Sequence, residues 1–214
     1  MALKILKVSE IFYSVQGEGA CAGAPCVFIR LAGCNLSCSW CDTRYASQGG
    51  VDMNLSDIVE KAESFGCDLI TITGGEPLLQ KNTPGLAAIL LNKGYKLLVE
   101  TNGSLDIDIM DKRATRIMDI KCPSSNESGK NNFVNIKALT KNDELKFVIA
   151  DKNDYDFAKS IIKSNDIPCL IWFSAVYGRL EHQELAAWIL KDGLNVRLLI
   201  QIHKIIWSPD TRGV

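Results

Sequence analysis

Three of the chain's eight cysteines lie within the segment GCNLSCSWCDT, residues 33–43. Cys34, Cys38 and Cys41 have the spacing CxxxCxxC. A disulfide uses two thiols and a closed structural zinc site uses four ligands. Three thiolates can instead hold three irons of a cubane 4Fe–4S cluster and leave the fourth iron open. The spacing therefore predicts a metal centre with one coordination position free for another ligand.

The five remaining cysteines keep a zinc site open as the weaker alternative. Cys67, Cys122 and Cys169 lie in or beside apolar runs, where a free cysteine usually packs as a small apolar residue. Cys21 and Cys26 lie upstream of the triplet and could supply a fourth ligand. Disulfides are expected even less, because the chain has the features of a cytosolic protein, in which thiols stay reduced.

The bulk properties indicate a single cytoplasmic domain spanning residues 1–214. A chain of this length buries enough surface to form a core. The formal net charge of -1 predicts no nucleic-acid partner. No run approaches the roughly 18 continuous apolar residues that a membrane helix needs. The opening segment MALKILKVSEIFYS is too interrupted by charge for a signal peptide. We therefore expect a cytoplasmic protein with no membrane partner.

Apolar runs of strand length alternate with stretches of helical spacing. Continuous β-branched and leucine-rich runs are typical of strands buried on both faces of a parallel sheet. The expected strands are residues 25–31, 67–73, 95–100, 115–121, 144–150, 168–173 and 196–202. The expected helices are residues 54–65, 83–94, 153–164 and 179–193. This alternation predicts an α/β fold with a mostly parallel sheet, either open or curled into a partial barrel.

Polar and glycine-rich segments come directly after these strands. The cysteine segment follows the first strand, GGEP (74–77) the second, TNGS (101–104) the third and CPSSNES (122–128) the fourth. In parallel α/β folds, functional sites gather at the carboxyl ends of the strands. Ordinary turns also use glycine, serine and asparagine, but they do not require the cysteines. The sequence therefore predicts one active site at this edge of the sheet.

The cysteine triplet, the aromatic Trp40 before its last member and GGEP together resemble the radical S-adenosylmethionine (SAM) enzymes. The resemblance implies a partial (β/α)6-type barrel, a trimmed form of the superfamily core. It also implies a 4Fe–4S cluster on the three cysteines, whose open iron binds SAM. One-electron cleavage of SAM then yields a radical that abstracts hydrogen from the substrate. Glycines let the backbone approach SAM closely. The residues expected to contact SAM are Trp40, Gly74, Gly75, Glu76, Thr101 and Ser124.

A narrower resemblance covers most of the chain. The 7-carboxy-7-deazaguanine synthases share segments similar to EIFYSVQGEGACAGAPCVFIRLAGCNLSCSWCDT, DIKCPSS, DELKFVI and QIHK. Those lyases convert 6-carboxy-5,6,7,8-tetrahydropterin to 7-carboxy-7-deazaguanine with loss of ammonia, in queuosine and deazapurine biosynthesis, and Mg²⁺ supports the reaction. The chemistry calls for an electron donor such as flavodoxin, and the resemblance implies a homodimer.

The substrate implied by this resemblance has a carboxylate and an edge that both donates and accepts hydrogen bonds. Arg30 offers a fork of donors for the carboxylate. Gln16 and Glu18 offer an amide and a carboxylate that can read a guanine-like edge. Each also has a plain structural interpretation, as a packing arginine or as part of a solvated loop. No catalytic residue is assigned, and the residues expected at the substrate are Gln16, Glu18, Arg30, Thr73 and His203, with Gln201 beside the last.

Thr43 directly follows the cluster segment and offers a hard oxygen close to the expected substrate. The resemblance implies that Mg²⁺ binds there and that the substrate carboxylate shares the ion, in keeping with the preference of Mg²⁺ for oxygen ligands. In the plain alternative, Asp42 and Thr43 begin a helix or turn. Lys146 lies within an expected strand, where its stem packs on apolar surface or its ammonium reaches SAM, and it stays outside the catalytic set.

Two other functions stay open at this point. A glycyl-radical-enzyme activase shares CxxxCxxC, but it would leave the QGEG and QIHK segments unexplained. A non-enzymatic iron–sulfur carrier or a structural zinc protein needs neither GGEP nor a polar cavity. Binding of SAM separates the two enzymes from the carrier, and turnover of the carboxytetrahydropterin separates the synthase from the activase.

Overall fold

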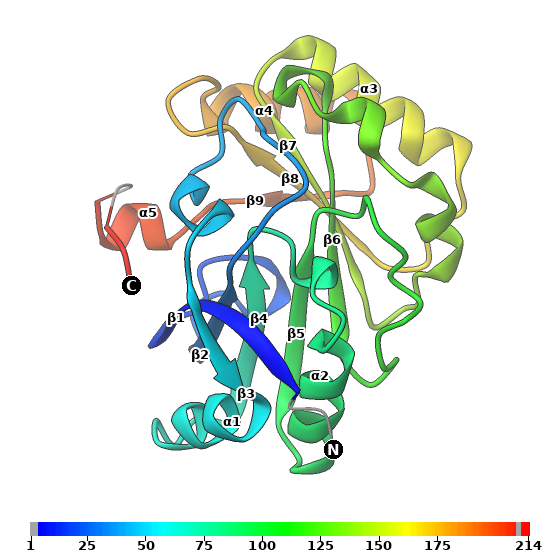
Figure 1. Cartoon of the computed structure of the whole chain (residues 1–214). Helices are drawn as coiled ribbons and strands as arrows, with labels where there is room; N and C mark the ends of the chain where they lie inside the picture. Colours follow the sequence, from blue (N-terminus) through cyan, green and yellow to red (C-terminus); the bar gives the residue numbers. More distant parts are fainter. Residues whose placement is uncertain (1–3, 209–210) are drawn as a thin grey trace.

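The computed structural model describes residues 4–208 and 211–214. Within these residues the chain forms one nine-stranded sheet in the order β3-β1-β2-β4-β5-β6-β7-β8-β9 (Figure 1). The two edge strands, β3 and β9, are not hydrogen-bonded to one another, so the sheet is open. This confirms an α/β fold with a mostly parallel sheet, and it shows that the barrel is not closed.

The parallel part of the sheet follows the sequence closely. All seven expected strands are present, but the last is only three residues long instead of seven. Each of these seven strands is hydrogen-bonded in parallel to the next one along the chain, and the last of them forms one edge of the sheet. The strands are β2 (Pro25–Leu31), β4 (Leu69–Gly74), β5 (Lys96–Thr101), β6 (Thr115–Ile120), β7 (Glu144–Ile149), β8 (Leu170–Ala175) and β9 (Arg197–Leu199).

Two antiparallel strands were not expected from the sequence. The 11-residue β1 (Ile5–Val15) pairs with β2 and with the short β3 (Val51–Asn54), antiparallel in both cases. Most of β1 is half-buried or exposed, and it carries Lys7 and Glu10 among its apolar residues. Only two of the eleven β1 residues are buried, so its apolar residues are spread among polar ones and form no compact run, and the four residues of β3 are too few to show a period.

The four expected helices are present, together with one that was not expected. The long ones are α1 (Leu55–Glu63), α2 (Thr83–Asn92), α3 (Lys152–Ser164) and α4 (His182–Asp192). Asp151 caps α3 by accepting a hydrogen bond from the Asp154 N–H, and Gly193 ends α4 at a φ of 58°. The apolar run 196–202 leaves the sheet early, and its continuation forms the short helix α5 (His203–Ile206). His203 therefore begins a helix instead of ending a strand.

The two faces of the parallel strands have different roles. One face packs against the helices and forms the main core, in which Ile70, Ile72 and Phe147 are completely buried. On the other face Phe28, Leu98 and Ile117 form a smaller apolar cluster. Because side chains alternate along a strand, the residue two positions further on shares that face. Those residues are charged and lie toward the carboxyl ends of the strands: Arg30, Glu100 and Asp119.

The described part of the chain has no helix that combines the length and the apolar character needed to cross a membrane.

Candidate active site

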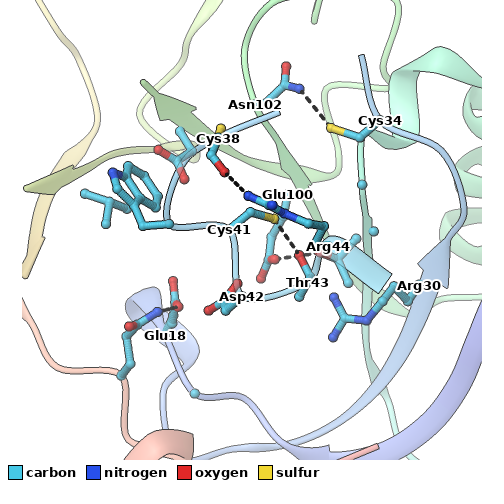
Figure 2. A pocket seen from close by; sticks show the side chains of 18 of the residues that line it. Glu18, Arg30, Cys34, Cys38, Cys41, Asp42, Thr43, Arg44, Glu100 and Asn102 are labelled. Carbon is cyan, nitrogen blue, oxygen red and sulfur yellow. Dashed lines mark hydrogen bonds between the residues drawn. The ribbon is translucent and has the colours of Figure 1, made fainter. Parts of the chain in front are cut away.

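A cavity of about 980 Å³ lies where the parallel strands end (Figure 2). Its wall includes side chains from the carboxyl-terminal halves of β2, β4, β5, β6 and β7, from the loop 33–48 and from α5. It therefore occupies the edge of the sheet at which the sequence predicts a site. Most of the expected site residues line it, namely Gln16, Glu18, Arg30, Cys34, Cys38, Trp40, Cys41, Thr43, Thr73, Gly74, Gly75, Thr101 and His203.

Cys34, Cys38 and Cys41 all line this cavity, from one loop after β2. The Leu36 N–H lies 3.5 Å from the Cys34 sulfur, and the Asn102 amide nitrogen lies 4.0 Å from it. Burial raises the pKa of the Cys34 thiol, and it raises that of Cys38 to about 11. Buried thiols of this kind become thiolates when a metal binds them.

The donor set of this loop fits an iron–sulfur cluster better than a single metal ion. Among the described residues no three Cys, His, Asp or Glu side chains are grouped around one ion position. A structural zinc ion needs such a tetrahedral group, whereas a cubane takes each thiolate at a separate corner. Three soft donors on the wall of a roomy cavity therefore suit the cluster, and zinc bound by four side chains does not fit.

The glycines of GGEP bring the loop after β4 against the backbone of the cysteine loop. Gly75 donates its N–H to the Leu31 carbonyl, and the Glu76 N–H donates to the Gly33 carbonyl at 2.8 Å. A Cβ on Gly75 would lie 2.3 Å from the Gly33 oxygen and 2.7 Å from the Cys34 Cβ. The absence of a side chain is therefore what allows this close approach.

Gly75→Ala is expected to displace the cysteine loop, because the added Cβ overlaps its backbone, and to weaken binding of the SAM that the sequence motifs imply by about tenfold or more, the effect of losing about 1.4 kcal/mol of binding free energy. Isothermal titration of SAM into the reconstituted protein measures the change. Gly129→Ala is the matched control, because a Cβ there meets no atom within 4 Å. Equal SAM affinities for the two variants would contradict the expectation.

Glu76 is completely buried and is not among the residues that line the cavity. Its carboxylate accepts hydrogen bonds from the Leu78 N–H at 2.9 Å, the Thr101 hydroxyl at 2.9 Å and the Asn102 N–H at 2.6 Å. Burial raises its pKa, and these three donors oppose that effect. The structure thus places Glu76 behind the cavity wall, where it joins the loop after β4 to the loop after β5.

Ser124 also lies behind the wall. Its hydroxyl donates to the carboxylate of Asp154 and accepts from the indole N–H of Trp40 at 3.1 Å. Asp154 is completely buried in the first turn of α3 and also accepts from the N–H groups of Ser124 and Ala150. Asp154 was missed from the sequence, because an acidic residue in a first helical turn is ordinary. Its effect is to fix the orientation of Trp40 at the cavity.

Arg30 stands at the cavity edge (Figure 2), and one side of its guanidinium is held by Glu10. Its Nε donates to Glu10 at 2.7 Å, and its guanidinium carbon lies 5.7 Å from the ring centre of Phe12 and 6.0 Å from that of Tyr45. The described residues offer no hydrogen-bond acceptor to its two terminal nitrogens. Those nitrogens remain available for an anion in the cavity.

Glu18 is held in the cavity by two donors. Lys146 Nζ lies 2.7 Å from Oε2, and the Gln201 amide donates to Oε1 at 2.5 Å. Burial alone would raise the pKa of Glu18, but the charge of Lys146 and these hydrogen bonds outweigh it and hold the pKa at about 2. Glu18 is therefore a carboxylate at any physiological pH.

Gln16 lines the cavity, but its amide already has partners. The Nε2 group donates to the Thr71 hydroxyl at 3.1 Å, and Oε1 accepts from the Glu18 N–H at 3.2 Å. Gln16 is 2 % exposed, and the hydrogen bonds of its amide go to other residues of the chain. Its clearest role in this structure is to position the backbone of Glu18.

Thr73 lines the cavity from β4 and His203 lines it from α5. The Thr73 hydroxyl donates to Glu100 at 2.8 Å. His203 sits against Gly17, where a Cβ would lie 2.0 Å from the imidazole Nδ1. Burial lowers the pKa of His203, which favours the neutral ring. The imidazole can therefore both donate and accept a hydrogen bond in the cavity.

Thr43 offers one hydroxyl to the cavity, 3.7 Å from the Cys41 sulfur. Its neighbour Asp42 accepts a hydrogen bond from Lys204 on α5 at 2.8 Å. No group of three acidic, histidine or cysteine side chains surrounds this position in the described chain. A divalent cation here would depend on oxygens from a substrate and from water for most of its ligands.

Comparisons with known proteins show the family to which the chain belongs. Residues 28–164 match the model of the radical SAM superfamily. The chain is 45 % identical to the 7-carboxy-7-deazaguanine synthase of Chlorobaculum tepidum, over 98 % of this chain and 97 % of that protein. It is 39 % identical to the enzyme of that name from Koribacter versatilis, over 98 % and 100 %. The structure of QueE from Escherichia coli matches with a TM-score of 0.71 at 20 % identity, covering 92 % of this chain and 94 % of that one.

Proposed function

Because the chain belongs to the radical SAM superfamily and, within it, to the family of the 7-carboxy-7-deazaguanine synthases, we propose that its cavity converts 6-carboxy-5,6,7,8-tetrahydropterin to 7-carboxy-7-deazaguanine. The reaction is a ring contraction with loss of ammonia, so the enzyme is a carbon–nitrogen lyase. One observation carries the proposal: a single cavity brings the three thiols together with a free guanidinium fork and a permanently charged carboxylate.

The cysteine side of the cavity is suited to the two cofactors of the superfamily. Cys34, Cys38 and Cys41 would hold the 4Fe–4S cluster, and Gly74 and Gly75 would let backbone atoms approach SAM. When bound, the cluster supplies the electron that cleaves SAM, and SAM supplies the radical that starts the reaction on the pterin.

The opposite side of the cavity is suited to the pterin. The two terminal nitrogens of Arg30 form a fork that matches a carboxylate. Each oxygen of Glu18 has one donor from the chain and one lone pair left, so the pair can accept two N–H groups from the amino edge of the ring. Thr73 and His203 then complete the hydrogen bonds around the ring, with His203 neutral.

The proposal includes one Mg²⁺, bound at Thr43. The threonine hydroxyl and the substrate carboxylate would be hard oxygen ligands of one Mg²⁺, and waters would complete its shell. Because the chain supplies so few oxygens there, the ion is expected to bind weakly until the pterin is present.

Four further expectations remain predictions: one domain over residues 1–214, a cytoplasmic location, a homodimer and flavodoxin as reductant. Radical SAM enzymes need an electron donor, and the reduced thiols of a cluster loop suit the cytoplasm. Sedimentation of the reconstituted protein tests the homodimer, and reduction by flavodoxin tests the electron donor.

Anaerobic reconstitution with iron and sulfide, followed by mass spectrometry, tests the proposed function. With SAM, Mg²⁺ and a reductant, the carboxytetrahydropterin should yield carboxydeazaguanine and ammonia. A protein that cleaves SAM but leaves the pterin unchanged would overturn the synthase and support an activase. A protein that binds no SAM would overturn the enzyme altogether.

A further inference from the structure

Lys146 is a half-buried cation at the cavity to which the proposed function assigns no role. It lies on β7, and its Nζ is 2.7 Å from Oε2 of Glu18 and 3.7 Å from Oδ2 of Asp119. The Lys146 side chain is 13 % exposed, and all three side chains line the cavity. β6 and β7 bring Asp119 and Lys146 together, since these residues are direct partners in the parallel register.

Few other cations can replace Lys146 at Glu18. Among the described residues Lys146 is the only cation in a salt bridge with Glu18. The neighbouring Lys121 pairs with Asp119 instead, at 3.0 Å. Burial disfavours the ammonium, but Glu18, Asp119 and Glu100 outweigh this and raise the pKa of Lys146. Without Lys146, the ammonium of Lys121 would be the one cation in the described chain still in a salt bridge with Glu18, Asp119 or Glu100, through Asp119.

The charge on Glu18 decides which ring edge can bind. A carboxylate accepts from two N–H groups, such as the 2-amino group and the adjacent ring N–H of a pterin, and it repels a carbonyl oxygen in the same place. A protonated Glu18 would donate one hydrogen bond, so it would tolerate the 2-oxo edge of a lumazine. Lys146 also fixes the rotamer of Glu18 from one side, while Gln201 fixes it from the other.

We propose that Lys146 is a positioning residue that sets ring specificity: by keeping Glu18 charged and oriented, it makes the cavity select 2-amino pteridines over 2-oxo pteridines. The inference rests on the proposed function, because it assumes that Glu18 meets the amino edge of the substrate. It goes beyond that function in naming the residue on which the discrimination depends and the analogue that is rejected.

Binding of 6-carboxypterin and 6-carboxylumazine to the reconstituted, SAM-loaded protein tests the inference. The wild-type protein should prefer carboxypterin by about 100-fold or more, because the lumazine oxygen would face the carboxylate oxygens of Glu18 with no hydrogen atom between them. In Lys146→Met this preference should fall by about tenfold or more, mainly through weaker carboxypterin binding. Lys146→Arg keeps the charge and should retain most of the preference.

The pH dependence gives an independent readout. Wild-type affinity for carboxypterin should be flat between about pH 6 and 8, because Glu18 stays charged throughout. In Lys146→Met burial is less opposed, so the pKa of Glu18 rises and affinity should fall as the pH is lowered. The charged or titratable groups that face Glu18 and Lys146 from the packed elements are His203, Lys204, Asp42, Glu100, Asp119 and Lys121.

Lys93→Met is the matched control, since Lys93 pairs with Glu63 at 2.8 Å on the surface, away from the cavity. Glu18→Gln is the second variant: it removes the charge directly and should lose the preference as Lys146→Met does, even if the lysine variant folds poorly. A folded Lys146→Met with wild-type preference and a flat pH profile would overturn the inference. Equal weakening of both ligands would overturn it too. Wild-type protein that bound neither pteridine would instead overturn the proposed function.

Discussion

Cys38→Ala is expected to leave the protein folded but unable to hold a 4Fe–4S cluster, and SAM cleavage should fall by about 10³-fold or more. Cys38 supplies one of three thiolates on the cavity wall, and two thiolates leave two irons without protein ligands. The Cys38 side chain is buried but belongs to none of the hydrophobic core clusters, so the fold should tolerate its replacement by alanine. Iron and sulfide content and visible absorbance after reconstitution measure the cluster, and thermal unfolding measures the fold.

Cys169→Ala is the control for this prediction. Cys169 is half-buried, packs against the main core and is not among the cavity-lining residues. Its variant should bind the full complement of iron and cleave SAM at the wild-type rate. A Cys38→Ala protein that still assembled the cluster, or a wild-type protein that took up a single zinc ion in its place, would contradict the assignment of the three cysteines.

The sequence predicted the parallel strands well because apolar and β-branched residues dominate each run and most of them are buried, even where β5, β6 and β7 carry a charged residue on the cavity side. β2 was predicted with its observed bounds, Pro25–Leu31. β1 was missed because a strand beside the edge is half-exposed and carries charges, so its period is obscured. β9 was predicted too long because the apolar run 196–202 contains both the strand and the approach to α5, and hydrophobicity alone does not mark where the chain leaves a sheet.

The loops chosen from the sequence surround one cavity, but the sequence could not tell which of their side chains face it. The GGEP and CPSSNES loops lie where expected, yet Glu76 and Ser124 turn their polar atoms into hydrogen bonds that join neighbouring loops. Residue type cannot separate a ligand contact from such a brace, because both need the same donors and acceptors. Asp154 and Lys146 were not assigned because a sequence does not show which distant residues meet in the fold. Their partners, Ser124 and Glu18, lie 30 and 128 residues away in the chain.

Arg30→Met should raise the KM for the carboxytetrahydropterin by about 100-fold or more, with a smaller effect on kcat. Hydrogen bonds to a charged group contribute about 1.5–3 kcal/mol each, and a fork makes two of them. Glu10, Phe12 and Tyr45 hold the guanidinium so that little rotamer freedom is lost when an anion binds. Steady-state kinetics of the reconstituted enzyme measures both constants.

Two comparisons show whether Arg30 acts on the carboxylate itself. Arg30→Lys keeps the charge without the fork, so its KM should lie between those of the wild type and Arg30→Met. Binding of tetrahydropterin, which lacks the carboxylate, should be weak in the wild type and nearly unchanged by Arg30→Met. If the methionine variant weakened both pterins equally, Arg30 would be shaping the wall through Glu10 and Tyr45, and the carboxylate would have another partner. A loss of packing would weaken the binding of both pterins. The loss of an ion pair with the carboxylate would weaken only the binding of the carboxytetrahydropterin, so the comparison isolates the role of the Arg30 fork.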